Sequence, residues 1–526
     1  MYDYVLRNGL VVDGKRTKPY KASVCIKDGV IASITEEPNI EAKEVIDCEG
    51  KIISPGFIDL HTHSDACPLN TENVQSMLNQ GVTLQIGGNC GISVIPSNEE
   101  REKEIRAFYA RTIEKTIQDK TMVMNNMKDY FNVGSSNKLS INSGMLIGHG
   151  TLRASVMGFE DRVPTVEEME EMKNVLDGEL KSGVFGMSLG LIYPPSSYAK
   201  VEEFVELAKV IKANNGILTS HMRNEADKIF DSLSEMIEVA EKSGVHLHIS
   251  HLKLMGKPQW GKSQEVLDFI DDARKRGCTI TCDQYPYEAT ATGLAALVPG
   301  WALDGGNDKM LERLEKKEDR LVKDMTEIMD KRGGPARVVV ASTHGKLPEV
   351  EGKSLEEISK ILGVGPIDGA IEILLKCKAE VAAIYFSLHL DDVYNIMKSM
   401  DIATGSDGVD FNYDVSYSPH PRYFGTFPRF LQIVREQNLM AVEDAVYKIT
   451  SLPASILNLK NRGSIEVGKI ADITVFDFDE VKDMSTFAKS AVKPKGIYHV
   501  FVAGTPALLN SSQTENRKGQ IVLKDN

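Results

Sequence analysis

The chain has 526 residues, of which 42% are hydrophobic, and carries a formal net charge of -14. This length allows more than one domain, and the apolar share is ample for a large core. The acidic excess, which no face-sized basic run offsets, argues against nucleic acid or an anionic membrane as a partner. We therefore expect a small-molecule substrate.

The start of the chain, MYDYVLRNGLVVDGKRTK, lacks the basic leader and apolar core of a signal peptide. The longest weakly charged stretch, residues 289–303, is too short to span a bilayer and contains Pro299. The seven cysteines are scattered and do not resemble a disulfide framework. These features predict a cytoplasmic location without a membrane partner, and they carry no prediction of oligomeric state.

Both ends of the chain predict short strands. The runs YDYVLRNGLVVDG, KASVCIKDGVIASI and AKEVIDCEGKIISPG end in glycine turn signals typical of hairpins. Near the other end, GSIEVGKIADITVFDFD, GIYHVFVAGTPAL and KGQIVLKDN also predict strands. We expect residues 1–56 and 455–526 to build one small β-sandwich domain, with the rest of the chain inserted between them.

Residues 57–454 alternate apolar strands with amphipathic helical stretches, which indicates an α/β fold with a parallel sheet. Eight strands are expected, in GFIDLHTH, GVTLQIGGNCG, INSGMLIGHG, GVFGMSLGL, GILTSHM, VHLHISHLK, CTITCDQYPY and DIATGSDG. Eight strands favour a closed (β/α)8 barrel of the TIM type. The interval of approximately residues 288–400, after strand seven, is too long for a loop, so we expect an inserted subdomain that could cover the barrel mouth.

Metal-ligand side chains recur at the ends of these strands, where barrel active sites lie. In chain order they are His61, His63, Cys90, His149, His221, His251 and Asp407. His61 and His63 point the same way, because strand side chains alternate with period two. Zinc favours imidazole and thiolate ligands, and catalytic zinc sites keep one position open for water. The pattern predicts a catalytic zinc site.

Some of these residues allow a second interpretation. Cys90 alone would be a small buried hydrophobic residue, but its position among the histidines favours a ligand, with Gly87, Gly88 and Gly91 giving it clearance. Asp407 can contact a metal and accept a proton from water.

The sequence indicates the roles of three further histidines and one further aspartate less clearly. His149, between two glycines, fits either a partner of the site or a structural residue. Asp283 fits either an orienting role or a turn hydrogen bond, and we expect His246 and His248 to be packing residues.

The motifs PGFIDLHTHSD, GNCG, SHMRNE, ISHLK, YPY, GSDG and HPRYFGTFPRFL, with LPASILNLKNRGSIEVGKIADITVFD, resemble the amidohydrolase superfamily. Within it, the chain resembles the D-aminoacylases, which are N-acyl-D-amino-acid deacylases, over essentially its whole length. The resemblance implies hydrolysis of N-acyl-D-amino acids to a carboxylate and a free D-amino acid.

The resemblance also implies roles for individual residues. His221, His251 and Cys90 would hold a tight zinc ion, and His61 and His63 a second, weaker one. Asp407 would be the general base that takes a proton from zinc-activated water and returns it to the leaving amine. The implied substrate-binding residues are Arg422 for the α-carboxylate, Lys253 and Tyr193 for the pocket, and Tyr287 for the scissile carbonyl.

Other members of the superfamily suggest alternative functions for this chain. Hydantoinases and dihydroorotases are expected to carry a carboxylated lysine on strand four, but GVFGMSLGL has none, which leaves Cys90 to bridge. YEATATGLAALVPG contains no lysine or arginine for a second carboxylate, which favours substrates with neutral or hydrophobic side chains over N-acyl-D-glutamate or D-aspartate, although Lys253 could serve that carboxylate. A non-catalytic scaffold is the alternative from another class, but the ligand set is complete.

Overall fold

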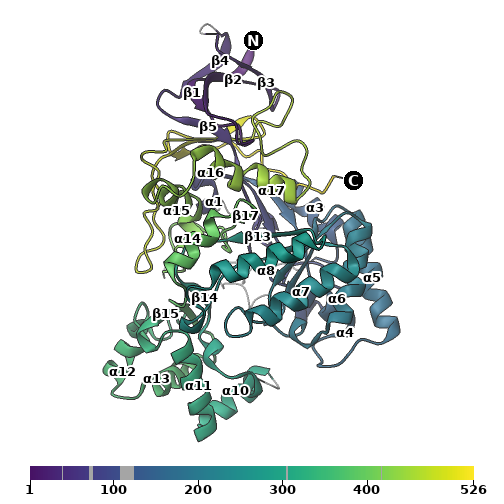
Figure 1. Cartoon of the computed structure of the whole chain (residues 1–526), viewed down its shortest axis with the longest axis vertical. Coiled ribbons are helices and arrows are strands. Elements are labelled where there is room, and N and C mark those ends of the chain that lie inside the picture. Colours follow the sequence, from purple (N-terminus) through teal and green to yellow (C-terminus); the bar gives the residue numbers. More distant parts are fainter. Residues whose placement is uncertain (38–39, 70–74, 107–123, 304–305, 416–417, 526) are drawn as a thin grey trace.

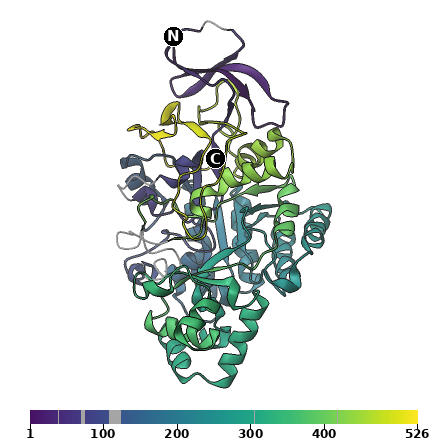
Figure 2. The ribbon, with the colours of Figure 1, turned by 90° about the vertical axis from the view of Figure 1, so that its left-hand side faces the viewer.

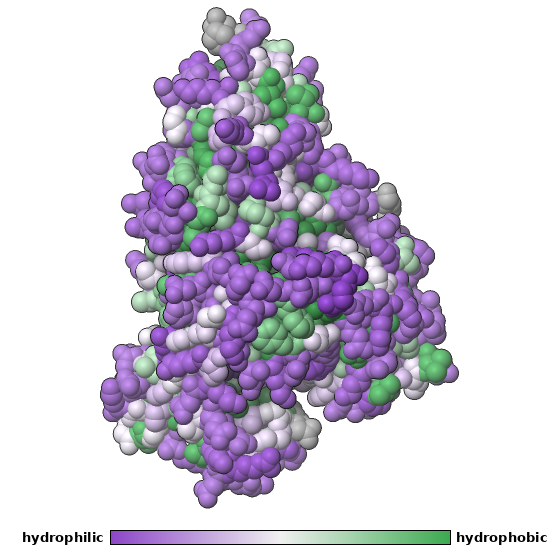
Figure 3. Space-filling view, in the orientation of Figure 1, coloured by the Kyte–Doolittle hydropathy of each residue, from purple (hydrophilic) through white to green (hydrophobic). Residues whose placement is uncertain are grey.

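The fold is that of a computed structural model, described here for residues 1–37, 40–69, 75–106, 124–303, 306–415 and 418–525. The first five strands lie at one end of the molecule, a set of helices between residues 306 and 376 lies at the opposite end, and the bulk of the chain lies between them (Figure 1). Hydrophilic residues cover most of the face shown in Figure 3, with apolar residues scattered among them. No helix within the described ranges is both long and apolar enough to cross a bilayer.

Strands from both ends of the chain lie in one sheet. Its strands are β1 (Tyr2–Val11), β2 (Tyr20–Lys27), β3 (Val30–Thr35), β4 (Ala42–Asp47), β5 (Ile52–Pro55), β18 (Ile473–Phe476), β19 (Ile497–Val502), β20 (Thr505–Leu509) and β21 (Ser512–Gln513). They are hydrogen-bonded into one nine-stranded sheet in the order β21-β20-β19-β18-β5-β1-β2-β3, with β4 on β1. This differs from a sandwich of two separate sheets. Figure 2 shows the C-terminal strands beside the N-terminal ones.

The final run of the chain was expected in this small sheet, and that prediction is wrong. Gly519 and Ile521 instead form bridges with Leu139 and Ser143 beside the third strand of the central sheets. Ile521 is 6% exposed and belongs to the large apolar core around those strands. The alternation of KGQIVLKDN predicts a strand-like segment, but it does not specify which sheet edge receives it.

All eight central strands are found. They are β6 (Phe57–Asp59), β7 (Val82–Gly87), β8 (Asn142–Met145) with β9 (Ile147–Gly148), β10 (Gly186–Gly190), β11 (Ile217–His221), β12 (His246–Ile249), β13 (Ile280–Gln284) and β17 (Ile402–Thr404). The third strand is split at Leu146, so the pairing falls into a sheet β6-β7-β8 and a sheet β17-β13-β12-β11-β10-β9. All these pairs are parallel, and a parallel bridge between Thr62 and Gly408 joins the first strand end to the last.

Helices that connect or follow these strands pack on the outside of the sheets (Figure 1). They are α1 (Ser76–Asn79), α3 (Met127–Ser136), α4 (His149–Met157), α5 (Val166–Lys181), α6 (Val201–Ala213), α7 (Ile229–Ser243), α8 (Ser263–Lys275), α14 (Leu390–Lys398), α15 (Arg422–Glu436), α16 (Val442–Ile449) and α17 (Ser451–Ile456). Local chemistry fixes their ends: Thr165 and Glu168 form a capping box at the start of α5. Gly244 adopts the left-handed conformation that ends α7.

The interval after strand seven has a core of its own. It contains β14 (Thr290–Gly293), β15 (Val338–Ser342) and β16 (Ala382–Tyr385) in one antiparallel sheet, with α9 (Gly300–Leu303), α10 (Gly306–Lys316), α11 (Asp319–Lys331), α12 (Leu355–Leu362) and α13 (Pro366–Lys376). Apolar residues from these elements form a separate cluster. α14 does not contribute to this cluster. It is attached to the start of α8 instead, where Asp392 accepts hydrogen bonds from the backbone amides of Gly261 and Ser263.

Candidate metal centre and active site

The six predicted ligands all lie at the carboxyl ends of central strands. His221 is the last residue of β11, and the other five follow β6, β7, β12 and β17 by a few residues. His61, Cys90, His251 and Asp407 form the tightest group, in which one ligand atom from each lies within 4.8 Å of all the others. All four side chains are buried.

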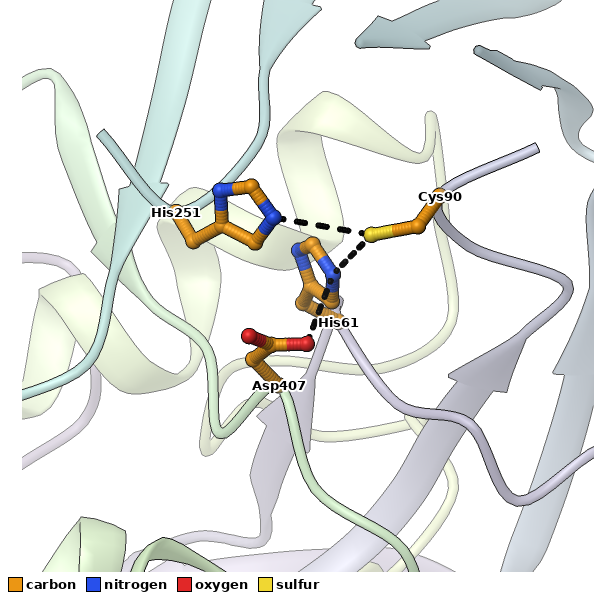
Figure 4. Close-up of side chains that lie close together, drawn as sticks. All are labelled: His61, Cys90, His251 and Asp407. Atoms are coloured by element: carbon orange, nitrogen blue, oxygen red, sulfur yellow. Dashed lines mark hydrogen bonds and ion pairs between the residues drawn. The ribbon is translucent and has the colours of Figure 1, made fainter. Parts of the chain in front are cut away.

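Figure 4 shows how these four side chains converge from separate loops. The Nε2 atom of His61 lies 3.3 Å from Cys90 Sγ and 3.4 Å from Asp407 Oδ1. Cys90 Sγ lies 3.5 Å from His251 Nε2. Nitrogen, sulfur and oxygen donors of these types are the ligands that zinc uses in proteins. The donor set therefore fits a zinc ion.

The remaining two predicted ligands flank this group. His63 Nε2 lies 3.0 Å from Asp407 Oδ1, and His221 Nδ1 lies 3.0 Å from His251 Nε2. His221 and His251 also form a second close group with Glu225. The structure thus brings together all six residues.

The backbone at the ligand positions is unusual. Cys90, His251 and Asp407 have φ angles of 52°, 37° and 50°, in the left-handed region that non-glycine residues seldom adopt. Glycines beside Cys90 allow this close packing: a Cβ atom on Gly88 would lie 2.0 Å from the Leu146 carbonyl oxygen. A side chain at Gly88 would therefore clash with the backbone of the neighbouring strand, which explains the need for glycine there.

Electrostatics favour the metal-binding forms of two ligands. Burial alone would raise the pKa of the Cys90 thiol, but the imidazoles of His61 and His251 bring that pKa well below its usual 9.0. Burial also opposes ionisation of Asp407, while the Arg422 guanidinium and His63 hold its pKa well below the usual 3.8. A thiolate and a carboxylate are the forms that bind metal ions.

Asp283 orients two of the ligands, which settles the choice between its two interpretations. Its Oδ2 atom lies 3.1 Å from His61 Nδ1, and its Oδ1 atom accepts a hydrogen bond from the His251 backbone at 2.8 Å. It also lies 2.8 Å from His248 Nε2, so His248 is a buried polar partner rather than simple packing. His246 lies 2.9 Å from the Thr281 hydroxyl, which also lies 2.8 Å from His248 Nδ1. A carboxylate on the outer ring nitrogen leaves the inner nitrogen of His61 free for a metal.

Glu225, which was not predicted as a site residue, has a matching position beside His251. Its Oε1 atom lies 3.0 Å from His251 Nδ1 and accepts a hydrogen bond from Lys253 Nζ at 2.7 Å. Glu225 and Lys253 are only 3% and 6% exposed. Because Glu225 lies four residues after His221 in SHMRNE, a carboxylate following a strand-end histidine was the available signal.

Arg422 lies beside the metal-ligand group and contacts Asp407. Its Nη1 atom lies 2.8 Å from Asp407 Oδ2. Its guanidinium lies 5.1 Å from the centre of the Tyr285 ring. Within the described part of the chain, Arg422 Nε and the Tyr285 hydroxyl are buried without a hydrogen-bond partner. Buried unpaired donors of this kind are costly, and they suit a site that a polar ligand completes.

The two predicted pocket tyrosines occupy different surroundings. The Tyr193 ring lies 5.5 Å from the His221 ring, beside the ligand group. The Tyr287 hydroxyl instead donates to Asp483 at 2.9 Å and is fully buried. The structure therefore brings Tyr193, Lys253 and Arg422 to the ligand group but engages Tyr287 elsewhere.

His149 is buried and does not contact the six predicted ligands through the hydrogen bonds of its ring. Its ring nitrogens lie 3.0 Å from the Ser196 hydroxyl and 2.9 Å from Glu203 Oε1. Arg153 also donates to Glu203, at 3.1 Å. These residues form a group separate from the six ligands.

Comparison with known proteins agrees with this arrangement. A model of the amidohydrolase family matches residues 52–507. The chain is similar to a D-aminoacylase of Alcaligenes xylosoxydans xylosoxydans, at 30% identity over 99% of this chain and 98% of that protein. It is also similar to an N-acyl-D-glutamate deacylase of the same organism, at 32% identity over 99% and 97%.

Among solved structures, the chain is similar to an N-acyl-D-glutamate deacylase from Bordetella bronchiseptica in complex with zinc and a phosphonate that mimics the tetrahedral intermediate. The TM-score is 0.84, at 29% identity over 100% of both chains. These matches confirm the resemblance inferred from the motifs. The chain belongs to the amidohydrolase family and, within it, groups with the D-aminoacylases.

Proposed function

We propose that the protein hydrolyses the amide bond of N-acyl-D-amino acids with the help of zinc, releasing a carboxylate and a free D-amino acid. The observation that carries this proposal is the meeting of Cys90, His61, His251 and Asp407 at one buried point, with Arg422 beside it. The similarity to D-aminoacylases and N-acyl-D-glutamate deacylases supports the same reaction class.

The architecture that we infer is a closed (β/α)8 barrel over residues 57–454, with a small β domain from residues 1–56 and from residues 455–526 apart from the final run, which pairs beside β8. The parallel pairing of all eight central strands and the Thr62–Gly408 bridge support a closed ring. We infer that the inserted subdomain, expected at approximately residues 288–400, comprises the elements from Thr290 to Tyr385, because these share one core. The seven cysteines, all free, support the proposed cytoplasmic location.

We propose that His221, His251 and Cys90 hold one tight zinc ion and that His61 and His63 contribute to a second, weaker position, with Asp407 facing both. Zinc at such a site supplies Lewis acidity toward the amide carbonyl and lowers the pKa of water to about 7. Asp283 and Glu225 hold the outer nitrogens of His61 and His251, so their Nε2 atoms face the ligand group.

Asp407 is the proposed catalytic base. Its low pKa keeps it ionised near neutral pH, so it can accept a proton at Oδ1 and later return one to the leaving amine. Its Oδ2 atom is fixed by Arg422 at 2.8 Å, which limits the carboxylate to one orientation. General acid-base catalysis of this kind contributes roughly 10² to 10⁴ in rate.

We propose that Arg422 binds the α-carboxylate of the substrate, with Lys253 and Tyr193 lining the pocket. The buried, unpaired Nε atom of Arg422 supports this role. Tyr285 replaces Tyr287 as the tyrosine that contacts the scissile carbonyl, because its hydroxyl is buried without a partner while its ring lies beside Arg422. Tyr287 donates to Asp483 and is given a structural role.

The proposed substrates have neutral or hydrophobic side chains. The two buried cations at the site already have carboxylate partners, Arg422 with Asp407 and Lys253 with Glu225. A substrate with a second carboxylate would have to compete for one of them. The alternative is an N-acyl-D-glutamate or D-aspartate deacylase, and similarity to an N-acyl-D-glutamate deacylase keeps it in view.

A substrate panel tests the proposal. The zinc-loaded protein is mixed with N-acetyl-D-methionine, N-acetyl-L-methionine and N-acetyl-D-glutamate, and free amino acid is quantified. We expect the D-methionine derivative to react fastest and the L-isomer not at all. Preference for the D-glutamate derivative would establish the alternative, preference for the L-isomer would exclude a D-aminoacylase, and no product from any compound would favour a non-catalytic scaffold.

A further inference from the structure

The loop after β10 carries Tyr193 to the candidate active site. The Tyr193 ring lies beside His221, with the two ring centres 5.5 Å apart. The preceding residue, Ile192, is 42% exposed, so this loop borders solvent. An aromatic side chain on such a loop needs a rigid support to keep one position beside a substrate.

Ser196, at the start of the 3-10 helix η3 (Ser196–Tyr198), joins this loop to a buried group of polar side chains. Its hydroxyl lies 3.0 Å from His149 Nδ1, and His149 Nε2 lies 2.9 Å from Glu203 on α6. Arg153 Nε donates to the same Glu203 oxygen at 3.1 Å. The exposed fractions of Ser196, His149, Glu203 and Arg153 are 2%, 0%, 5% and 0%. The proposed hydrolysis assigns no role to any of the four.

The proton on His149 follows from its partners. Glu203, already paired with Arg153, is a carboxylate that only accepts hydrogen bonds, so His149 Nε2 donates to it. In a neutral imidazole protonated at Nε2, the Nδ1 atom accepts a hydrogen bond from the Ser196 hydroxyl. The helix α4, on which His149 and Arg153 lie, is therefore linked to the loop through oriented hydrogen bonds.

A second anchor holds the other side of the same loop. Arg223, two residues after His221, donates to the carbonyl oxygens of Ser197 at 2.7 Å and Ala199 at 3.1 Å. Its guanidinium also pairs with Glu235 at 2.9 Å. The loop is thus attached both to the His149 group and to the segment that carries a proposed metal ligand.

We propose that His149 and Ser196 are positioning residues that hold Tyr193 in place for the substrate. Without the Ser196 hydrogen bond, η3 keeps its attachment to Arg223 but loses the one to α4, so Tyr193 gains freedom to move. A serine, histidine and carboxylate together also occur in nucleophilic hydrolases. Here Arg153 pairs with the Glu203 carboxylate, and Ser196 and His149 are both buried. These features favour a role in holding the loop over nucleophilic attack by Ser196.

This inference rests on the proposed function, because Tyr193 must contact substrate for its support to affect catalysis. The test compares Ser196→Ala with Ser197→Ala, a neighbour whose carbonyl holds Arg223 whatever its side chain. We expect Ser196→Ala to lower kcat/KM for N-acetyl-D-methionine roughly tenfold, mostly through KM, with unchanged zinc content. Ser197→Ala should stay within about twofold of wild type.

A double-mutant cycle with Tyr193→Ala separates support of Tyr193 from general structure. In the Tyr193→Ala background, Ser196→Ala should have no further effect on kcat/KM. An equal loss in both backgrounds would overturn the proposal, because it would mean that Ser196 acts independently of Tyr193. Labelling of Ser196 by a fluorophosphonate would also overturn it, in favour of a nucleophile.

Hydrogen exchange provides a readout that does not need activity. Amides in residues 190–200 should exchange faster in Ser196→Ala than in wild type, and not in Ser197→Ala. Unchanged exchange in Ser196→Ala would contradict the proposal. If wild-type protein hydrolyses none of the panel, the proposed function fails, while the exchange comparison still decides whether Ser196 supports the loop.

Discussion

Individual ligand residues were predictable because each occupies a local position that the strand pattern defines. His61, Cys90, His251 and Asp407 each follow a strand within a few residues, and they meet in the structure. The tyrosine assignment was less predictable. β13 ends at Gln284, before Tyr285 or Tyr287, so strand alternation does not decide which of the two points inward. Their separate partners, which the tertiary fold supplies, distinguish them.

Asp407→Asn and Cys90→Ala should have different effects. The asparagine keeps the shape and an oxygen but cannot accept the proton, so turnover should fall by roughly 10² or more while zinc stays largely bound. Cys90→Ala removes a thiolate from the centre of the ligand group, so zinc and activity should be lost together. Zinc content and rates of both purified variants check this. Full turnover in Asp407→Asn, or full zinc in Cys90→Ala, would contradict these roles.

Glu225→Gln should weaken zinc binding although Glu225 is not one of the six proposed ligands. The change removes the negative charge beside His251 Nδ1 and leaves the Lys253 ammonium without its carboxylate. Loss of an orienting partner of this type typically costs roughly 10-fold to 100-fold in metal affinity. Competition with a chelator measures this affinity. Glu238→Gln, an exposed position on α7, is the matched control, and equal affinities of the two variants would exclude the orienting role.

At the scale of elements, the order and type of the central strands follow from the sequence, whereas edges and junctions do not. The third strand is divided at Leu146, whose amide donates to Gly87 of β7. The last run of the chain pairs beside β8, and not in the small sheet that its neighbours β19 and β20 occupy. Both outcomes depend on which edges other elements leave open, and the local pattern holds no information about that.

The helix α16 contains a buried lysine, Lys448, which makes the stability of the fold depend on pH. Lys448 is 1% exposed, and its ammonium donates to the Ser399 carbonyl. Burial lowers the pKa of Lys448 from 10.5 to about 7. Between these two values the unfolded chain binds the extra proton, so the free energy of unfolding should rise with pH across this window by up to about 1.4 kcal/mol per unit.

Lys448→Met should therefore be more stable than wild type at pH 7, because methionine fills similar space without a charge. The advantage should shrink toward pH 9, because above pH 7 the unfolded wild-type chain still binds the lysine proton that the folded chain releases, so a rise in pH stabilises folded wild type. Urea unfolding of both proteins at pH 7, 8 and 9 measures the difference. A difference that stays constant with pH would show that Lys448 is not the titrating group.

At the scale of the whole molecule, one segment of the small domain reaches the active-site region. Between β18 and β19 the chain leaves the small sheet, and Asp483 in this segment accepts the Tyr287 hydroxyl. The Phe487 ring lies 5.1 Å from His420 and 4.6 Å from Phe386 of the inserted segment. The sequence predicted that both ends share one domain, but a contact between parts so distant in sequence left no local signal.

This segment supports Arg422 indirectly, through His420. The Arg422 backbone amide donates to His420 Nδ1 at 3.0 Å, and Phe487 packs edge-on against the same imidazole. Phe487→Ala would leave space beside His420 and loosen the start of α15, where the proposed carboxylate-binding arginine lies. We expect KM for N-acetyl-D-methionine to rise roughly tenfold with a smaller change in kcat. Zinc content should not change, because the aromatic rings beside Phe487 are those of Tyr287, Phe386 and His420, and none of these is a proposed ligand.

Thr486→Ala, at the exposed neighbouring position, is the matched control and should keep the wild-type KM. Phe487→Leu should restore most of the binding, because it refills the space without the aromatic edge. A fall in kcat at constant KM would instead place the effect on the reacting groups, and parallel loss of zinc would indicate general unfolding. A selective rise in KM therefore distinguishes support of Arg422 by the small domain from a purely structural contact.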